Sequence, residues 1–203
     1  MEKPIFLFNL DATLIRTEII PAIAGALKRE EALIRLNTLT EAATRGEMPF
    51  KQFFLKQIEL FKDIPISRIN QMVMDMPLNE KLVDFMKRYH DRCYIVTSNL
   101  DVWIEGLVKK LGMEKNVFSS KALAENDYMQ SVLSIIDKNA VVNQMVLPFA
   151  AIGNGNNDAE MIESAQIGIA YGAIREIGFP VLACADYAIY EEDKLIEFLE
   201  RLV

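Results

Sequence analysis

Three short polar segments carry the side chains that could do chemistry, and each follows an apolar run. An aspartate in such a place can act as a general acid or base, and hydroxyl, amide and ammonium groups can donate hydrogen bonds to an anion. The segments contain Asn9, Asp11 and Thr13; Thr97, Ser98 and Asn99; and the run Gly153-Asn154-Gly155-Asn156-Asn157-Asp158. Any function of the chain depends on how the fold brings these segments together.

The elements around these segments predict an α/β fold with a doubly wound parallel sheet. Residues 4–10 form a continuous apolar run, as expected of a strand buried on both faces. After Pro77, strands alternate with helices, which is typical of a parallel sheet. We expect strands at 93–97, near 117–118, and at 149–153, 167–171 and 186–190, and helices at 79–89, 101–111, 132–145, 157–165, near 174–183 and at 192–202. Ligands bind beyond the carboxyl ends of such strands, so the three polar segments are expected to line one edge of the sheet.

Residues 16–76 have a different pattern. Apolar residues recur there at spacings of three and four, as in Leu33 and Leu36 or Phe50, Phe53 and Phe54, which predicts helices without an intervening strand. We therefore expect a core domain made of residues 1–15 and 77–203. Residues 16–76, called the cap segment below, are expected to be a helical insertion able to cover the site.

Composition excludes several classes of function. The net charge of −7 and the absence of a basic stripe argue against nucleic-acid binding. No apolar run reaches the roughly 18 to 20 residues of a membrane span, and the two cysteines show no disulfide or zinc spacing, which favours a reducing cytoplasm without a membrane partner. The single histidine, His90, gives little support to a Ser-His-Asp triad and is expected to be a solvated helix end.

Four motifs in order resemble those of the haloacid dehalogenase superfamily, in the layout of its phosphoserine-phosphatase-like members. FLFNLDATL is similar to the first motif, Asp-x-Asp-x-Thr after an apolar strand, and YIVTSN to the second. Lys138 is the candidate lysine of the third, and AAIGNGNNDAEMIESAQIGIAYG resembles the fourth, written GDGxND. The RGEMPFKQF segment also resembles the corresponding part of that subfamily's cap.

The resemblance implies a phosphatase-type hydrolase that acts on a small phosphomonoester with Mg²⁺. In the family the first aspartate attacks phosphorus and the second transfers protons, which places Asn9 at the nucleophile and Asp11 at the acid–base position. Thr97 and Lys138 complete the catalytic candidates. The metal candidates are Asn9, Asp11, Asn154 and Asp158, and the substrate-binding candidates are Thr13, Glu18, Ser98, Asn99 and Asn157.

The sequence departs from the family at three positions. Asparagine replaces aspartate at Asn9 and Asn154, which removes the nucleophile and both charged metal-ligand side chains, so the Mg²⁺ site is expected to be weak. An arginine that the subfamily uses to bind the substrate carboxylate corresponds to Gln57, which removes a bidentate contact.

Plainer interpretations exist for the same residues. Asn9 and Thr13 can cap a turn, Lys138 can be a surface lysine, Glu18 can be a solvated acid at a helix start, and Asn157 or Asp158 can be an N-cap. For the whole chain three interpretations stay open: an impaired phosphomonoester hydrolase, a non-catalytic phosphate-binding or regulatory protein, and a phosphatase with engineered Asp→Asn changes.

Overall fold

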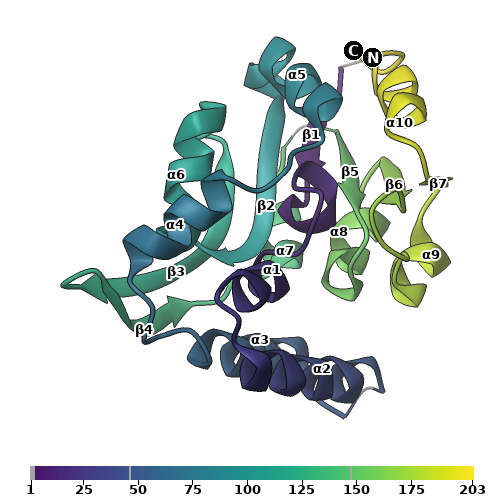
Figure 1. Ribbon diagram of the computed structural model, residues 1–203. Coiled ribbons are helices and arrows are strands. Elements are labelled where there is room, and N and C mark those ends of the chain that lie inside the picture. Colours follow the sequence, from purple (N-terminus) through teal and green to yellow (C-terminus); the bar gives the residue numbers. More distant parts are fainter. Residues whose placement is uncertain (1–2, 46, 147) are drawn as a thin grey trace.

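The computed structural model describes residues 3–45, 47–146 and 148–203. A seven-stranded sheet with helices on both faces forms its centre (Figure 1). The strand order is β4-β3-β2-β1-β5-β6-β7, and every neighbouring pair is parallel except β3 with β4. The strands are β1 (Ile5–Phe8), β2 (Cys93–Leu100), β3 (Val117–Glu125), β4 (Tyr128–Ser134), β5 (Phe149–Gly153), β6 (Ile167–Tyr171) and β7 (Tyr187–Ile189). The predicted α/β fold with a doubly wound parallel sheet is confirmed, with the antiparallel edge strand β4 as an addition that the prediction did not include.

β1 lies in the middle of the sheet, between β2 and β5, and all four of its side chains are buried. Phe6 and Phe8 pack into the core on one face, against α5 (Glu80–Arg88), while Ile5 and Leu7 belong to the core on the other face. Successive side chains of a strand point to opposite faces, so an uninterrupted apolar run suits this position. The carboxyl end of β1 therefore opens at the centre of the sheet edge.

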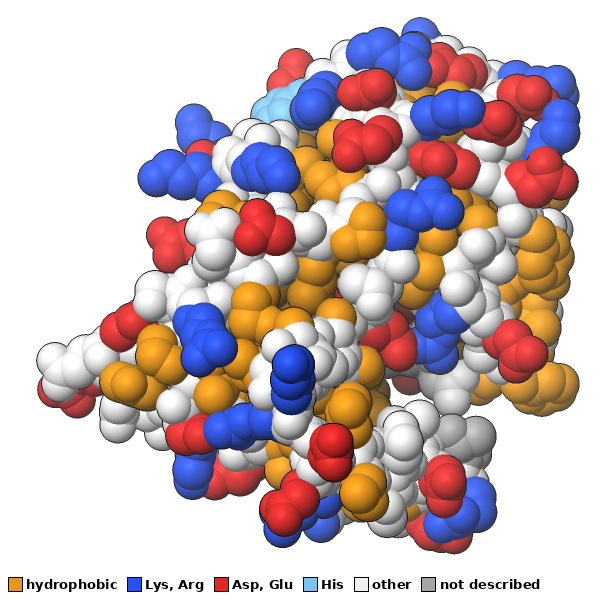
Figure 2. All heavy atoms as spheres, viewed as in Figure 1, with side chains coloured by type: hydrophobic (Ala, Val, Ile, Leu, Met, Phe, Trp, Pro, Cys, Tyr) orange, Lys and Arg blue, Asp and Glu red, His pale blue; other side chains and the backbone are white. Residues whose placement is uncertain are grey.

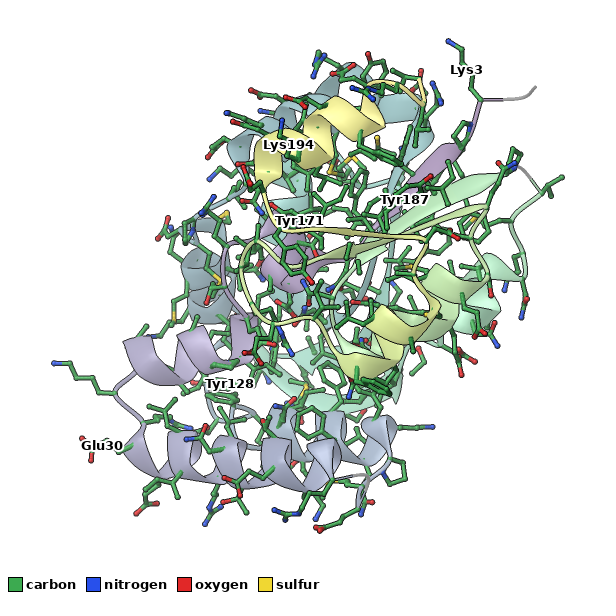
Figure 3. All side chains as sticks on the ribbon, turned by 90° about the vertical axis from the view of Figure 1, so that its right-hand side faces the viewer. Lys3, Glu30, Tyr128, Tyr171, Tyr187 and Lys194 are labelled. Carbon is green, nitrogen blue, oxygen red and sulfur yellow. The ribbon has the colours of Figure 1, made fainter. Side chains whose placement is uncertain are left out.

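Helices cover both faces of the sheet. The face of Phe6 carries α5, α6 (Asp101–Leu111) and α10 (Glu192–Leu199), and the other face carries α7 (Lys138–Val142), α8 (Ala159–Glu163) and α9 (Phe179–Cys184). Two short 3₁₀ turns, η2 (His90–Arg92) and η3 (Asn156–Asp158), precede β2 and α8. At the far edge of the sheet Tyr187 packs against Phe198 of α10, with ring centroids 4.6 Å apart; Figure 3 views this side. Because helices cover both faces of the sheet, β1 and β5 are accessible only at their ends.

The cap segment contains four helices and, in the part that the structure describes, no strand. The helices are α1 (Ile19–Ala26), α2 (Glu30–Thr44), α3 (Phe50–Glu59) and α4 (Ile66–Met74). Its two connections to the core lie side by side: the Arg16 N–H donates to Pro77 O at 2.8 Å, and the Asn79 N–H donates to Leu14 O at 2.9 Å. Figure 1 shows α2 and α3 beyond α1, on the side away from the sheet. Two adjacent connections are what an insertion into the core requires. The division into two domains stays a prediction.

The last helix of the cap segment packs against the core. The Gly106 N–H of α6 donates to Asn70 Oδ1 of α4 at 2.7 Å, and the Asn70 amide donates to Val102 O. The Lys110 ammonium also donates to Met74 O at 3.0 Å. These polar contacts fix α4 to α6.

The helix predicted at 132–145 is wrong over its first half. Residues 128–134 form β4, which pairs antiparallel with β3, and only residues 138–142 are helical. The strand expected near 117–118 therefore extends to Glu125. The two strands are joined by Asn126 and Asp127, whose φ angles of 51° and 69° lie in the left-handed region that tight two-residue hairpin turns need. Asparagine and aspartate tolerate this region better than most residues, so a hairpin forms here although the spacing of the apolar residues also fits a helix.

The molecular surface carries both signs of charge. Figure 2 shows lysine and arginine side chains interspersed with aspartate and glutamate on the face viewed. Across the described ranges, the helices are all too short or too polar to cross a lipid bilayer.

Candidate active site

The loop that follows β1 turns back on itself within a few residues. We call residues 9–18 the β1 loop. Ala12 has a φ of 50°, and its N–H donates to Thr17 O at 2.9 Å. The Asn9 N–H still donates to Ile152 O of β5 at 2.9 Å, so the loop leaves the sheet only after this residue. The tight turn therefore brings Asn9, Asp11 and Thr13 together in one short loop at the carboxyl edge of the sheet.

Both ends of the Asn9 side-chain amide are hydrogen-bonded. Asn9 Oδ1 accepts from the Lys138 ammonium at 3.0 Å, and Asn9 Nδ2 donates to Asp11 O at 2.9 Å. A lysine has only donors, so the oxygen of the amide must face Lys138 and the NH₂ group must face the carbonyl. Asn9 is buried, at 6% exposure. The amide is thus a fixed part of the site.

The loop that follows β5 is arranged around a buried carboxylate. We call residues 154–158 the β5 loop. Asp158 Oδ2 accepts the N–H groups of Asn154 and Gly155, each at 2.9 Å, and Asp158 Oδ1 accepts from Lys138 at 2.5 Å. A Cβ on Gly153 would lie 2.6 Å from Asp158 Oδ2, so this carboxylate requires glycine at the end of β5. Asp158 and Lys138 therefore form a buried ion pair.

The second asparagine connects the two loops. Asn154 Nδ2 donates to Ala12 O at 2.7 Å and to Thr13 Oγ1 at 3.2 Å. Asn154 and Thr13 are both buried. As at Asn9, the amide supplies an N–H to a backbone carbonyl of the β1 loop.

Asp11 is the carboxylate that remains partly open. Its side chain is half-buried, and it accepts the Ile19 N–H on Oδ1 at 3.0 Å and the Asn99 amide on Oδ2 at 2.8 Å. Burial raises the pKa of Asp11 from 3.8 to about 6, although the hydrogen bonds from Asn99 and Ile19 lower it. A carboxyl group with such a pKa can accept and donate a proton near neutral pH.

The end of β2 supplies hydroxyl and amide groups. Thr97 Oγ1 accepts from Asn99 N at 3.2 Å and from Asn99 Nδ2 at 3.0 Å, which leaves its hydroxyl hydrogen to donate. Asn99 Oδ1 is buried and has no hydrogen-bond partner in the described part of the chain. Ser98 Oγ accepts from Asn157 Nδ2 at 3.0 Å, so β2 is also tied to the β5 loop.

Eight of the eleven sequence-predicted residues meet in this network, two pair beside it, and one lies apart. Continuous hydrogen bonds connect eight of them: Asn9, Asp11, Thr13, Thr97, Asn99, Lys138, Asn154 and Asp158. Ser98 and Asn157 pair beside it. Glu18 instead forms an ion pair with Arg175, and both side chains are about two-fifths exposed, at 44% and 41%. Arg175 was missed by the sequence reasoning, because an arginine in a loop after β6 has no distinguishing pattern.

The four predicted metal ligands do not fit a divalent cation as they are arranged. Asn9 Oδ1 is used by Lys138, Asp11 O is used by the Asn9 amide, and Asn154 presents its NH₂ group to Ala12 O. Both oxygens of Asp158 have partners. Mg²⁺ requires several free oxygen ligands. In the described ranges, histidine, cysteine, aspartate and glutamate also form no cluster of three or more that could hold a metal.

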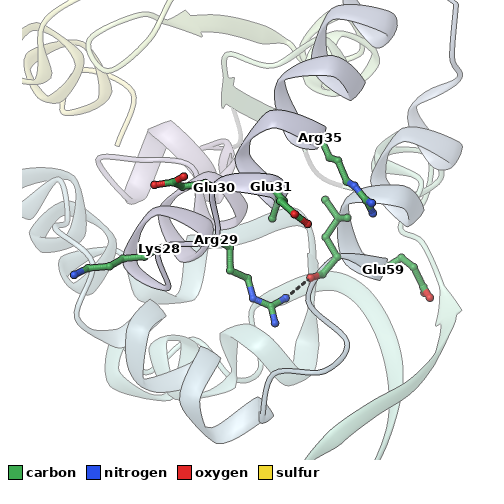
Figure 4. Close-up of a pocket in the computed structure, with 8 residues that line it drawn as sticks. Lys28, Arg29, Glu30, Glu31, Arg35 and Glu59 are labelled. Carbon is green, nitrogen blue, oxygen red and sulfur yellow. Dashed lines mark hydrogen bonds between the residues drawn. The ribbon is translucent and has the colours of Figure 1, made fainter.

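A shallow hollow lies away from this network, on the cap segment. It has a volume of about 600 Å³ and lies between the start of α2 and the end of α3 (Figure 4). Arg29 spans part of it, donating to Leu60 O at 2.8 Å and pairing with Asp63. Its lining mixes charges of both signs: Lys28, Arg29, Glu30, Glu31, Ala32, Arg35, Glu59 and Leu60. Such a lining does not select a ligand of one charge.

Comparison with known proteins supports the same fold and shows the family. The haloacid dehalogenase-like hydrolase family matches residues 6–163. A phosphoserine phosphatase of Methanocaldococcus jannaschii is 27% identical over 187 residues, covering 85% of this chain and 87% of that protein. One of Archaeoglobus fulgidus is also 27% identical over 187 residues, but the match covers only 53% of its length.

Solved structures agree in fold. A phosphoserine phosphatase described as a phospho-aspartyl intermediate analogue superimposes with a TM-score of 0.76, at 22% identity and 99% coverage of both chains. A haloacid dehalogenase family hydrolase of Salmonella enterica gives a TM-score of 0.78, at 20% identity, covering 96% of this chain and 71% of that one. The chain therefore belongs to the haloacid dehalogenase-like hydrolase family, in which it is phosphoserine-phosphatase-like.

Proposed function

We propose that this chain binds a small phosphomonoester at the carboxyl edge of the sheet and hydrolyses it weakly or not at all. The observation that carries the proposal is the Asn9 amide, whose oxygen is bonded to Lys138 and whose nitrogen is bonded to Asp11 O, at the position that the motif resemblance gives to the nucleophile. The relatives named phosphoserine phosphatases support a phosphate ester as the ligand.

Binding is supported by donors that remain available. The Thr97 hydroxyl accepts two hydrogen bonds and keeps its own hydrogen, and Lys138 uses two of its three N–H groups on Asn9 and Asp158. These donors point to recognition of the phosphoryl oxygens. Gln57 is buried in α3, and the sequence resemblance implies that the subfamily has a carboxylate-binding arginine at this position. The proposed class is therefore small phosphomonoesters in general, not phosphoserine in particular.

Weak turnover follows from the loss of the nucleophile. An amide is neutral and its nitrogen lone pair is delocalised, so Asn9 cannot form the covalent intermediate that a carboxylate forms. Asp11 can still activate a water molecule, since its raised pKa of about 6 suits proton transfer. Removal of a covalent catalytic residue costs roughly 10³-fold or more in rate. If the residual rate is zero, the chain is a phosphate-binding or regulatory protein.

The setting of this function is proposed to be the cytoplasm. Cys93 and Cys184 are free thiols, which supports a reducing compartment.

Phosphate release from a panel of phosphomonoesters, with and without Mg²⁺, tests the proposal. We expect the wild type to turn over at least about 10³-fold more slowly than the double variant Asn9→Asp with Asn154→Asp in Mg²⁺. Asn37 and Asn143 are exposed, so their double change to aspartate is a control with the same added charge. Wild-type turnover as fast as that of the double variant would refute the assignment of Asn9.

A further inference from the structure

We infer that Lys138 and the amide groups of Asn9 and Asn154 replace a divalent cation, so that the site binds a phosphate group without metal. This inference rests on the proposed function for the class of ligand. The side chains of the site would then balance the charge of a phosphate by themselves, without the Mg²⁺ that the sequence resemblance implies.

Two backbone carbonyls of the β1 loop accept hydrogen bonds from the two amides. Asp11 O accepts from Asn9 Nδ2 at 2.9 Å, and Ala12 O accepts from Asn154 Nδ2 at 2.7 Å. An aspartate at position 9 or 154 would set a carboxylate oxygen against a carbonyl oxygen at these distances, with no hydrogen between them. A cation would then be needed to hold the oxygens together. The two amides satisfy both carbonyls directly.

Lys138 lies between the β1 loop and the β5 loop. Its ammonium lies between Asn9 Oδ1 at 3.0 Å and Asp158 Oδ1 at 2.5 Å, and it is 4% exposed. It therefore bridges one residue of each loop, as a shared metal ion would. Because an ammonium has three donors, one N–H is left for a ligand oxygen.

The charges of the site are nearly balanced. Asp11 and Asp158 face one lysine, whereas aspartates at positions 9 and 154 would make four carboxylates against one lysine. A site with only one excess carboxylate repels a phosphate far less than one with three. The balance therefore does not require a divalent cation before an anion can enter.

An independent observation points to a missing partner at the same place. Asn99 Oδ1 is buried without a hydrogen-bond partner among the described residues, while its Nδ2 holds Asp11 and Thr97. Buried polar atoms are nearly always paired in folded proteins. A ligand carrying a protonated phosphoryl oxygen or a hydroxyl group would supply the donor.

The decisive experiment uses the wild-type chain. Inorganic phosphate and ethyl phosphate are each titrated calorimetrically in EDTA and in excess Mg²⁺, and Mg²⁺ alone is titrated as well. We expect the dissociation constant of the better ligand to agree within about twofold in the two buffers, and no heat from Mg²⁺ alone. Tighter binding of ethyl phosphate would identify an ester as the ligand, and tighter binding of inorganic phosphate would identify the free ion.

The other outcomes separate the inference from the proposed function. Binding that occurs only with Mg²⁺ would overturn the metal-free site and leave the proposed function standing. The absence of binding in both buffers would overturn both. Neither outcome depends on a variant that could misfold.

A matched pair of variants sharpens the result. The double variant Asn9→Asp with Asn154→Asp should gain Mg²⁺ binding and lose at least about tenfold in phosphate affinity in EDTA. The control Asn37→Asp with Asn143→Asp should behave as the wild type. An equal loss in the control would show that net charge, not the two amides, sets the affinity, and would refute the inference.

Discussion

The β1 loop and the β5 loop use the same two residue types in different ways. Each begins with an asparagine at the end of a strand and continues to an aspartate, and each asparagine donates to a carbonyl of the β1 loop. The aspartates differ: Asp11 is half-buried and held by two neutral donors, whereas Asp158 is fully buried and paired with an ammonium. From this contrast we propose that Asp158 mainly stabilises the structure, whereas Asp11 is the carboxylate that can exchange a proton.

The largest expected effect is a difference in stability between variants of the two aspartates. Asp158→Asn leaves the buried Lys138 without a counter-charge, so we expect the free energy of unfolding to fall by about 3 kcal/mol. Asp11→Asn should change it by less than about 1 kcal/mol at pH 5, since its partners are neutral. Urea unfolding in EDTA measures both. Equal losses would show that the two carboxylates do the same structural work.

The next largest effect is a difference in stability between variants of the two asparagines. In EDTA, Asn154→Asp should lower the free energy of unfolding by about 2 kcal/mol and Asn9→Asp by about 1 kcal/mol. A carboxylate at position 9 still accepts from Lys138, whereas one at position 154 faces Ala12 O. Urea unfolding of the two single variants gives the order. If Asn9→Asp proved the more costly change, the metal-free arrangement of the β1 loop would be wrong.

The sequence predicts the central strands of the sheet well and the β3–β4 edge poorly. β5 and β6 begin and end at the predicted residues, because buried parallel strands need uninterrupted apolar runs. The hairpin of β3 and β4 was missed because the apolar residues from 132 to 142 also fit a helical spacing, and the backbone of Asn126 and Asp127 decides between the two. A turn of two such residues between apolar stretches was the available signal.

The candidate site shows a similar division. The residue types at the strand ends were sufficient to predict which side chains gather there. Their hydrogen-bond partners were not predictable, because they depend on side chains from distant segments, such as Asn99 on Asp11 and Lys138 between Asn9 and Asp158. Those partners are the reason why the present arrangement does not suit Mg²⁺.

A third prediction uses the raised pKa of Asp11. Below pH 4 the carboxyl is protonated in both states, and between about 4 and 6 only the unfolded chain loses this proton, so Asp11 makes the fold less stable as pH rises. Above about pH 6 the penalty is constant. Since the side chain is partly exposed, we expect about 1 kcal/mol. The difference in unfolding free energy between Asp11→Asn and wild type, in EDTA, should therefore shift by about 1 kcal/mol in favour of the variant from pH 4 to pH 7. A difference independent of pH would remove the contrast with Asp158.

The smallest effect on stability is expected from the ion pair of Glu18 with Arg175, which joins the segments next to the two loops. Glu18 precedes Ile19, whose N–H holds Asp11, and Arg175 lies in the segment that reaches Gly178, whose N–H donates to Asn154 O at 2.8 Å. Water and salt screen the pair because both side chains are about two-fifths exposed.

Urea unfolding of Glu18→Gln, Arg175→Gln and the double variant gives the energy of this contact from a double-mutant cycle. We expect a coupling below about 0.5 kcal/mol that falls further in high salt, because exposed ion pairs seldom contribute more. The loops would then be joined mainly through the buried contacts of Asn154 and Lys138. A coupling above about 1.5 kcal/mol would contradict this, since the exposed ion pair would then couple the two loops as strongly as a buried charged contact does.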